Sequence, residues 1–544
     1  MESLSNSSLV VQSDYNWRSI KHKGCEIYFI GFTHSSANLL IERYLEKVGA
    51  RDIIQSLYRA HSFFAFILET KNEIFAAVDP TRSYPVLYKY SQQRFKIGNF
   101  GLLSDYSEFS TNDLSVEMFL SAGYFLGNKT ICTEVTSMVA GNYLIYKNKE
   151  LYLKEYYRYD PRLFTQNIKV IQDKDVHQEM DRVLNVSIKN TIEKADGKRI
   201  VLSLSGGLDS RLILSKLLEF KYDNIECISW GPIGNGDATG AASIASKSGV
   251  RWRHIETDSR FCKSIFWSDI RKEFWKYSFS GVSIPNFQEF FVLCKLRDHG
   301  CYNPDNVLLV NGQSGDFNSG GHLPNITSLI SCEQLIKDFI GKHFGLFPKL
   351  LDSKNFLNKV KLNLETDFGI NSDAIKNLIY ALDVFEFYER QSKWVINGQR
   401  SADFFEYSWD LPLWHKDVVA FFEKLDYPQR LHQNCFKSYI KDYDPFNLFQ
   451  VEIARPKWTG LSSSAIPVAR LIGLLFGTKA KDCTYKYFAY YGINQDQFSA
   501  YELLYFLRRA TSLRNCISLH TLTFLDEFSK YGISGLKNKK DRLI

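Results

Sequence analysis

The chain has 544 residues, which is too long for one compact core and predicts two to four domains. Its residues are 45% hydrophobic and 23% charged, as in ordinary globular proteins, which excludes a disordered, collagen-like or coiled-coil chain. The formal net charge of +7 is small for this length, so it permits an anionic ligand but gives no reason to expect nucleic acid binding.

Short runs of aromatic and β-branched residues alternate with polar turns through the first 160 residues. This spacing is typical of antiparallel hairpins, and helical spacing at 39–48 and 115–122 adds two helices. We therefore expect residues 1–160 to form an α+β domain built as an antiparallel β-sandwich. The expected strands are 25–32, 62–70, 73–79, 85–91 and 94–100, followed by a hairpin that turns at Lys149-Glu150.

The pattern changes after Asp160-Pro161, and the polar stretch 162–173 predicts a linker to a second domain, 161–544. An amphipathic helix at 180–192 comes first, and unbroken apolar strands then alternate with helices. Such strands are buried on both faces, so we expect an α/β domain with a parallel sheet, followed from about 325 by a mainly helical part. The expected strands are 199–205, 225–231, 251–257 and 306–312, with helices at 208–220 and 238–248.

A glycine-rich turn, SGGLDS (205–210), joins the first of these parallel strands to its helix. Glycines let backbone N–H groups approach an anion, which the helix N-terminus also attracts, and permit a sharp turn. Asp209 beside a phosphate requires a bridging cation, and Mg²⁺ prefers carboxylate and phosphate oxygens. The turn lacks the lysine of a Walker loop. It predicts a Mg²⁺–pyrophosphate site at Ser205, Gly206, Gly207, Asp209 and Ser210, with a plain strand-ending turn as the alternative.

Several segments, in order along most of the chain, resemble the asparagine synthetase family. SGGLDS resembles the pyrophosphate loop of its ATP-pyrophosphatase fold, and ISWG followed by Asp237 resembles the segment that holds the nucleotide. The N-terminal segment 61–90 resembles the hairpins of the family's class II amidotransferase-type domain. Three later segments resemble further family motifs: GQSGDFNSGG (312–321), LPLWHKDVVAFF (411–422) and ARPKWTG (454–460).

The resemblance implies ATP and Mg²⁺ as cofactors and gives roles to particular residues. Asp316 follows a strand end, and with Asp209 it would hold the metal on the triphosphate. Lys457 would stabilise negative charge on the oxyanion and the leaving phosphate. Gln313 falls where synthetases carry an acid, so it could orient an acyl group but cannot accept a proton. Further expected nucleotide contacts are Ser229 and Gly312.

Two departures from the family's pattern bear on the reaction. Phe317 stands where the family usually has glutamate, so we expect one metal or bridging contact to be missing. Glutamine-using members have an N-terminal cysteine nucleophile, whereas this sequence begins Met1-Glu2-Ser3 and Cys25 lies in a strand-like run. We therefore expect a degenerate amidotransferase domain that serves as a scaffold or a substrate-docking unit.

The expected function is an amide-bond synthetase that adenylates a carboxylate with ATP, releases pyrophosphate and transfers the acyl group to an amine or ammonia. The carboxylate would belong to a small molecule or a peptide in a biosynthetic pathway. Two alternatives stay open: an intramolecular cyclase, as in the similar β-lactam synthetases and lasso-peptide cyclases, or an inactive scaffold or binding protein. A tRNA-modifying enzyme fits less well because the positive charge is not clustered.

Cysteine spacing and apolar segments indicate the compartment. The ten cysteines form no CxxC pair, which favours reduced thiols, and the first residues lack the features of a signal peptide. The apolar segment 465–477 is interrupted by Pro467 and Arg470 and is too short to span a bilayer. We expect a cytoplasmic protein without membrane insertion, and whether it forms a homodimer stays open.

Overall fold

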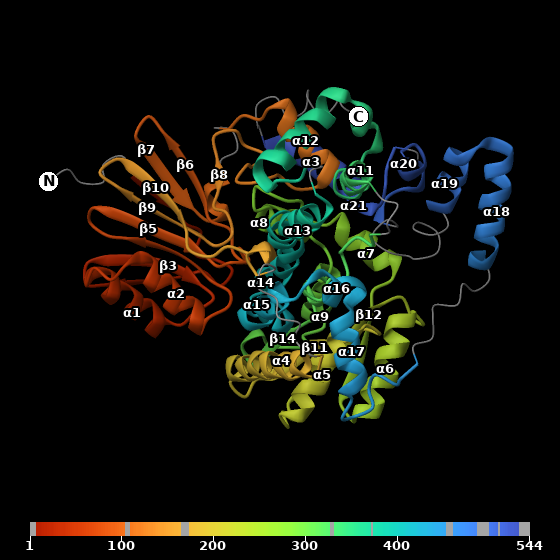
Figure 1. The fold of residues 1–544 in the computed structure, drawn as a ribbon, viewed down its shortest axis with the longest axis horizontal. Helices are drawn as coiled ribbons and strands as arrows, with labels where there is room; N and C mark the ends of the chain where they lie inside the picture. The colour runs from red at the N-terminus through yellow and green to blue at the C-terminus, as the bar shows by residue number, and fades with distance from the viewer. Residues whose placement is uncertain are drawn as a thin grey trace.

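A computed structural model with side chains gives the fold (Figure 1). A β-rich N-terminal part stands beside a larger part made of a parallel sheet and many helices. The fold is therefore mixed α/β, with antiparallel pairing concentrated in the N-terminal part and parallel pairing in the second. The structure describes residues 7–103, 109–164, 173–326, 331–371, 374–452, 461–486, 500–509 and 512–531.

A six-stranded antiparallel sheet in the order β10-β9-β5-β4-β3-β2 forms the centre of the N-terminal part. Side chains of a strand point alternately to its two faces, so neighbouring residues enter different cores. Phe66 shares one core with α1 (His34–Leu45) and α2 (Ala50–Ala60), whereas Ile67 belongs to the core on the opposite face. The strands are β2 (Arg18–His22), β3 (Cys25–Ile30), β4 (Ala65–Glu69), β5 (Glu73–Val78), β9 (Asn142–Lys147) and β10 (Glu150–Glu155).

A second sheet in the order β1-β7-β6-β8 covers that opposite face. Phe95 of the second sheet stacks on Tyr146 of the first, with ring centroids 4.4 Å apart, so the sheets face each other as expected of a sandwich. The expectation of purely antiparallel pairing is wrong at one point, because β1 runs parallel to β7. The strands are β1 (Ser7–Val10), β6 (Leu87–Ser91), β7 (Arg94–Gly98) and β8 (Thr136–Ser137).

The second part contains a five-stranded sheet in the order β13-β12-β11-β14-β15, and every neighbouring pair is parallel. Four of its strands lie where the sequence predicts them. The fifth was not predicted, because three residues are too few to show a pattern. The strands are β11 (Arg199–Ser203), β12 (Ile225–Gly231), β13 (Arg251–Glu256), β14 (Val307–Val310) and β15 (Ser408–Asp410).

Helices cover this sheet and form most of the chain after it. Those beside the parallel strands are α4 (Asp173–Ala195), α5 (Leu208–Glu219), α6 (Gly236–Ser248), α9 (Phe290–Asp298), α10 (Gly315–Asn318) and α15 (Lys416–Lys424). The others include α3 (Asp113–Ala122), α7 (Ser259–Phe266), α8 (Asp269–Ser278), α11 (Cys332–His343), α12 (Lys354–Phe368), α13 (Ile375–Phe385), α14 (Arg400–Phe404), α16 (Tyr427–Arg430), α17 (Asn434–Asp442), α18 (Leu461–Phe476), α19 (Thr478–Lys486), α20 (Leu503–Leu507) and α21 (Cys516–Phe528).

The largest apolar core continues from the N-terminal sheets into the helical part. It includes Ile67 before the predicted boundary at residue 160 and Phe387 far beyond it. The ten cysteines all lie within the described residues, and none forms a disulfide. No helix in the described ranges is both long enough and apolar enough to cross a membrane. The apolar segment predicted at 465–477 lies largely in α18, which has Pro467 inside it.

Candidate active site

The chain order of the parallel sheet reverses next to β11. Strands β12 and β13 lie on one side of it, and β14, which comes later in the chain, lies on the other. Loops that leave two such strands diverge and open a crevice at the carboxyl ends of the strands, where sheets of this kind bind ligands. The loop 204–207 after β11 and the loop 311–314 after β14 border this crevice.

The turn after β11 leads directly into α5, with Gly207 as the N-cap residue. Gly207 has no side chain, so no side-chain cap occupies the first-turn N–H groups of the helix, and an anion can take that place. Its φ of −73° is open to any residue, so the expectation that the turn depends on the conformational freedom of this glycine is wrong. The benefit of glycine here is an accessible backbone.

Asp209 and Asp316 lie together at the crevice. Asp209 is in the first turn of α5, Asp316 is in α10, and the backbone N–H of Asp316 donates a hydrogen bond to the Asp209 carboxylate. Burial and the negative charge of Asp316 outweigh this bond and raise the pKa of Asp209 to about 7. A divalent cation between the two carboxylates would remove this repulsion.

Two glycines in the loop after β14 permit this close approach. A Cβ atom at Gly315 would lie 2.6 Å from Cγ of Asp209, and one at Gly312 would lie 2.9 Å from its Cβ. Ser314, between them, has a left-handed φ of 65° that turns the loop into α10. The residues Ser314-Gly315-Asp316 are therefore constrained by packing against Asp209.

We expect Gly315→Ala to separate the two acids. The added methyl group forces a shift that costs about 1–3 kcal/mol in a packed site, and it acts directly on Asp209. The affinity for Mn²⁺–ATP, measured by titration calorimetry, should fall at least about tenfold. Gly341→Ala is the control, because a Cβ atom there meets nothing within 4 Å. Equal affinities in the two variants would contradict this account of the loop.

The crevice opens into a cavity of about 620 Å³, a size typical of small-molecule sites. The ends of β11, β12 and β14, the start of α9 and a π-helix at Glu386–Val395 line it. Gly206 is not among the lining residues, and its carbonyl accepts a hydrogen bond of 2.7 Å from the Arg211 guanidinium. The predicted site residues that the cavity brings together are Ser205, Gly207, Asp209, Ser210, Ser229, Gly312, Gln313 and Asp316.

Several of these residues are also hydrogen-bonded within the protein, Ser205 with Ser210 among them, and Ser229 and Gln313 each join separate elements. The Ser229 hydroxyl donates to the Leu204 carbonyl at 2.6 Å and accepts from Trp252 Nε1 at 3.1 Å, so it braces the strands. The Gln313 carboxamide donates to the Val395 carbonyl and accepts a 2.5 Å bond from Gln399. Gln313 therefore joins the loop after β14 to the segment that follows the π-helix.

Of the other predicted positions, Phe317 lies outside this cavity. Lys457 lies in 453–460, outside the described residues. Phe317 is buried and stacks on His322 with ring centroids 4.6 Å apart, beside Trp414. Its side chain belongs to the core behind α10, so in this chain position 317 does not face the paired acids.

The sequence analysis missed two charged side chains of the cavity. Glu289, at the start of α9, is buried, and its Oε1 accepts hydrogen bonds from Asn311 Nδ2 at 3.0 Å and Ser203 Oγ at 3.4 Å. Burial raises the pKa of Glu289 to about 7. Arg390 lies on the π-helix. The sequence does contain a signal for each of these residues, since both are charged positions within aromatic-rich runs.

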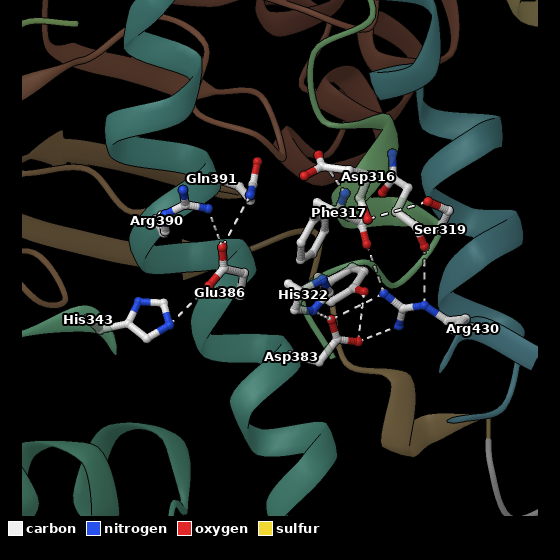
Figure 2. A network of polar contacts seen from close by, with 12 residues as sticks. Asp316, Phe317, Ser319, His322, His343, Asp383, Glu386, Arg390, Gln391 and Arg430 are labelled. Atoms are coloured by element: carbon white, nitrogen blue, oxygen red, sulfur yellow. Dashed lines mark hydrogen bonds and ion pairs between the residues drawn. The ribbon is translucent and has the colours of Figure 1, made fainter. Parts of the chain in front are cut away.

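Arg430, which does not line the cavity, holds the carboxyl end of α10 (Figure 2). Its guanidinium donates to the carbonyls of Asn318 at 3.2 Å and Phe317 at 3.4 Å, and it pairs with Asp383. Asp383 also accepts a bond of 2.8 Å from His322. Burial would raise the pKa of Asp383, but Arg430 and His322 outweigh it and hold that pKa well below its usual range. This buried cluster fixes the helix that carries Asp316.

The described residues contain no group of three or more His, Cys, Asp or Glu side chains placed to hold a metal ion. Asp209 and Asp316 are a pair. Mg²⁺ in nucleotide sites is typically held by one or two carboxylates, and phosphate oxygens and water supply the other ligands. The pair therefore fits a cation that arrives with a polyphosphate, and it does not fit a closed structural site.

Comparison with known proteins adds little. No family model and no curated protein matches the sequence. One similar structure is the NH3-dependent NAD synthetase from Campylobacter jejuni, with 17% identity, a TM-score of 0.22, and coverage of 42% of this chain and 97% of that one. Another is the glutamine phosphoribosylpyrophosphate amidotransferase from B. subtilis, with 11% identity, a TM-score of 0.15, and coverage of 55% and 58%. These values are too low to support a function.

Proposed function

We propose that this chain is an ATP-dependent carbon–nitrogen ligase of the asparagine synthetase kind. It would adenylate a carboxylate, release pyrophosphate and join the acyl group to an amine or ammonia with release of AMP. The observation that carries the proposal is the meeting of Asp209 and Asp316 beside the uncapped start of α5. Exposed backbone N–H groups next to paired carboxylates suit a polyphosphate bound with a divalent cation.

Asp209 and Asp316 are the residues that would hold Mg²⁺. When bound, the ion neutralises charge on the triphosphate and favours departure of pyrophosphate. Because burial and Asp316 raise the pKa of Asp209 to about 7, much of Asp209 is protonated at neutral pH without a cation. Binding of the ion should therefore release protons in this pH range.

The first step would take place at the glycine turn. A carboxylate oxygen attacks the α-phosphorus of ATP, and the bond from that phosphorus to the pyrophosphate oxygen breaks. The first-turn N–H groups of α5 and the hydroxyls of Ser205 and Ser210 would donate hydrogen bonds to the leaving group. Ser229 and Trp230, at the end of β12, and Asp237, in the first turn of α6, would border the nucleoside.

The second step needs a proton acceptor. The amine nitrogen attacks the acyl carbon, the bond from that carbon to the AMP oxygen breaks, and the nitrogen loses a proton. Gln313 cannot take it. We assign this role to Glu289, a buried carboxyl of the cavity whose pKa burial raises to about 7.

Glu289→Gln is expected to separate the two steps. ATP–pyrophosphate exchange should stay within about twofold of the unchanged protein, whereas amide formation should fall about 10²–10⁴-fold. In the unchanged protein the rate of amide formation should rise with pH through about 7, because the deprotonated carboxylate accepts the proton, and the variant should lose this rise. Glu226→Gln is the control, since Glu226 is also buried but pairs with Arg199 and Arg253. Loss of exchange in Glu289→Gln would assign Glu289 to nucleotide binding instead.

Exchange of labelled pyrophosphate into ATP, measured with a panel of carboxylates, tests the proposed function. We expect exchange that depends on both a carboxylate and Mg²⁺. An inactive scaffold or binding protein would show no exchange with any of them, and ATP binding without carboxylate-dependent exchange would also overturn the proposal.

The state of Cys25 bears on which compound supplies the nitrogen. This cysteine lies buried in β3, and burial raises the pKa of its thiol, so it is a poor nucleophile. We therefore propose that ammonia or an amine substrate is used and that glutamine is not hydrolysed. A cyclase would take the amine from the activated molecule itself. Amide formation without added ammonium or amine would favour the cyclase.

A further inference from the structure

The cavity has one end that the proposed nucleotide site does not use. This end lies under the π-helix and the segment after it, and Arg390, Gln391, Trp394 and Gln399 line it. Among the described lining residues Arg390 is the only cation, against the four carboxylates Asp209, Asp237, Glu289 and Asp316. A second anion brought into this cavity would therefore be drawn to Arg390.

Arg390 is held in a fixed orientation (Figure 2). Its NH1 donates to Glu386 Oε1 at 2.7 Å, and its guanidinium lies over the Trp394 ring, 5.4 Å from the centroid. Glu386 is buried, its Oε1 also accepts a bond from Gln391 at 3.3 Å, and its Oε2 lies 3.2 Å from His343 Nε2. About a third of the Arg390 side chain remains exposed. A guanidinium with one side held by a carboxylate keeps further N–H groups for a second, bidentate partner.

Arg390 also lies near the paired acids. Burial would lower its pKa, but Glu386 and, among smaller contributions, the charge of Asp316 raise it above its usual range. An acid group bound to Arg390 would thus lie close to the phosphates that Asp209 and Asp316 are proposed to hold. A carboxylate that attacks ATP must lie beside the bound phosphates, and a site on Arg390 in the same cavity would meet this need.

Apart from its carboxylates, the cavity that Arg390 lines is mostly uncharged and polar. Six carboxamides line the cavity, and those with bonds inside the protein keep unused N–H groups and lone pairs. Gln313, for example, donates one bond and accepts one, although its amide can make four. Carboxamides both donate and accept, as hydroxyl groups do, and Trp394 offers an apolar ring face. The six are Asn286, Gln288, Asn311, Gln313, Gln391 and Gln399.

An amino acid substrate would be poorly matched at this end, because its ammonium needs an available carboxylate. Glu289 is assigned above to the proton of the attacking amine, its Oε1 accepts bonds from Asn311 and Ser203, and burial raises its pKa to about 7. Glu386 does not line the cavity, and its Oε1 already accepts bonds from Arg390 and Gln391. The other carboxylates among the described lining residues are Asp209 and Asp316, which are assigned to the cation, and Asp237, which lies on the side of β12.

We propose that the end of the cavity under the π-helix binds a sugar-type acid, that is, a carboxylate on an uncharged, hydroxylated frame, with the carboxylate on Arg390 and the hydroxyls on the surrounding carboxamides. This inference rests on the proposed function, because it identifies the acid that ATP activates. The reaction is the one given above: the acid oxygen bonds to the α-phosphorus, and pyrophosphate leaves.

The experiment is ATP–pyrophosphate exchange with two sets of acids. One set contains D-glucuronate, D-galacturonate and their methyl glycosides, and the other contains L-aspartate, L-glutamate and succinate. We expect at least tenfold faster exchange with one or more of the sugar acids than with any acid of the second set. Exchange that is equal or faster with the second set would overturn the sugar-acid assignment and leave the proposed function standing. No exchange with either set would remove the proposed function, and this inference with it.

Variants of Arg390 test its role separately. Arg390→Met should raise the KM for the sugar acid at least tenfold, while the KM for ATP changes less than twofold. Arg390→Lys should raise the KM for the sugar acid by an intermediate factor, because lysine keeps the positive charge but lacks the planar guanidinium that binds a carboxylate through two hydrogen bonds. Arg297→Met is the control: Arg297 also pairs with a carboxylate, Asp298, and lies 5.1 Å from the centroid of an aromatic ring, Phe405, but outside the cavity. A larger rise in the KM for ATP than for the acid would overturn the assignment of Arg390.

Discussion

Asp209→Asn is expected to lower carboxylate-dependent ATP–pyrophosphate exchange by about 10³-fold, or about 4 kcal/mol of transition-state stabilisation. The amide keeps the size and the hydrogen-bonding oxygen of the side chain but removes its negative charge. It therefore leaves one carboxylate, Asp316, for a cation that must hold a triphosphate in position. Exchange measured over a range of Mg²⁺ concentrations should show a weaker dependence on the ion as well as a lower maximum.

Asp269→Asn is the matched control for this change. Asp269 occupies the first turn of α8 as Asp209 occupies the first turn of α5, but it is exposed and pairs with Lys272. Its removal should leave exchange within about twofold, because Asp269 is exposed and does not line the cavity. Exchange in Asp209→Asn within tenfold of the unchanged protein would contradict the proposed role of Asp209.

Arg430→Met is expected to give the largest loss of stability, about 3–5 kcal/mol in the free energy of unfolding. Arg430 and Asp383 are both buried, and removal of the guanidinium leaves a buried carboxylate without its main partner. Urea denaturation followed by tryptophan fluorescence measures the change. Arg430 also holds two carbonyls of α10. ATP–pyrophosphate exchange, measured at urea concentrations too low to unfold the variant, should therefore fall because Asp316 loses its fixed position.

Two further variants separate the buried charge from the loss of packing. Arg430→Met combined with Asp383→Leu removes both charges and should recover most of the lost stability. Arg182→Met, at an exposed pair with Glu179, should cost less than about 1 kcal/mol. If Arg430→Met lowers the free energy of unfolding no more than Arg182→Met does, the view that the cluster holds α10 is contradicted.

The same pair predicts the effect of acid. The pKa of Asp383 is held well below its usual range in the folded protein, whereas an unfolded aspartate titrates near about 3.9. The stability from this pair is therefore present above about pH 4 and is lost as the pH falls further. The difference in stability between the unchanged protein and Arg430→Met should shrink below pH 4.

Local sequence patterns predicted the parts of the site that are local in the chain. The strand, the glycine turn and the helix at 199–220 are contiguous, so their pattern placed Asp209, and the strand before Asp316 placed the second acid in the same way. The helix α2 was missed although Ile53, Ile54 and Leu57 have helical spacing. That signal was present in the sequence and was overlooked.

Other features depend on contacts between distant residues, and no local pattern marks them. Arg390 lines the cavity from a π-helix, and the aromatic run around it shows no change in period that would predict such a helix. Asp383 and Arg430 are 47 residues apart and meet only in the folded chain. The parallel pairing of β1 with β7 is likewise between segments far apart in sequence.

The most direct measurement of the central claim is a crystal structure of the protein with Mn²⁺ and a non-hydrolysable ATP analogue. The account predicts an anomalous peak within coordination distance of the carboxylates at 209 and 316, with the β- and γ-phosphates against the first turn of α5. A nucleotide whose phosphates bind away from the 205–210 turn, or a metal that contacts neither carboxylate, would contradict it.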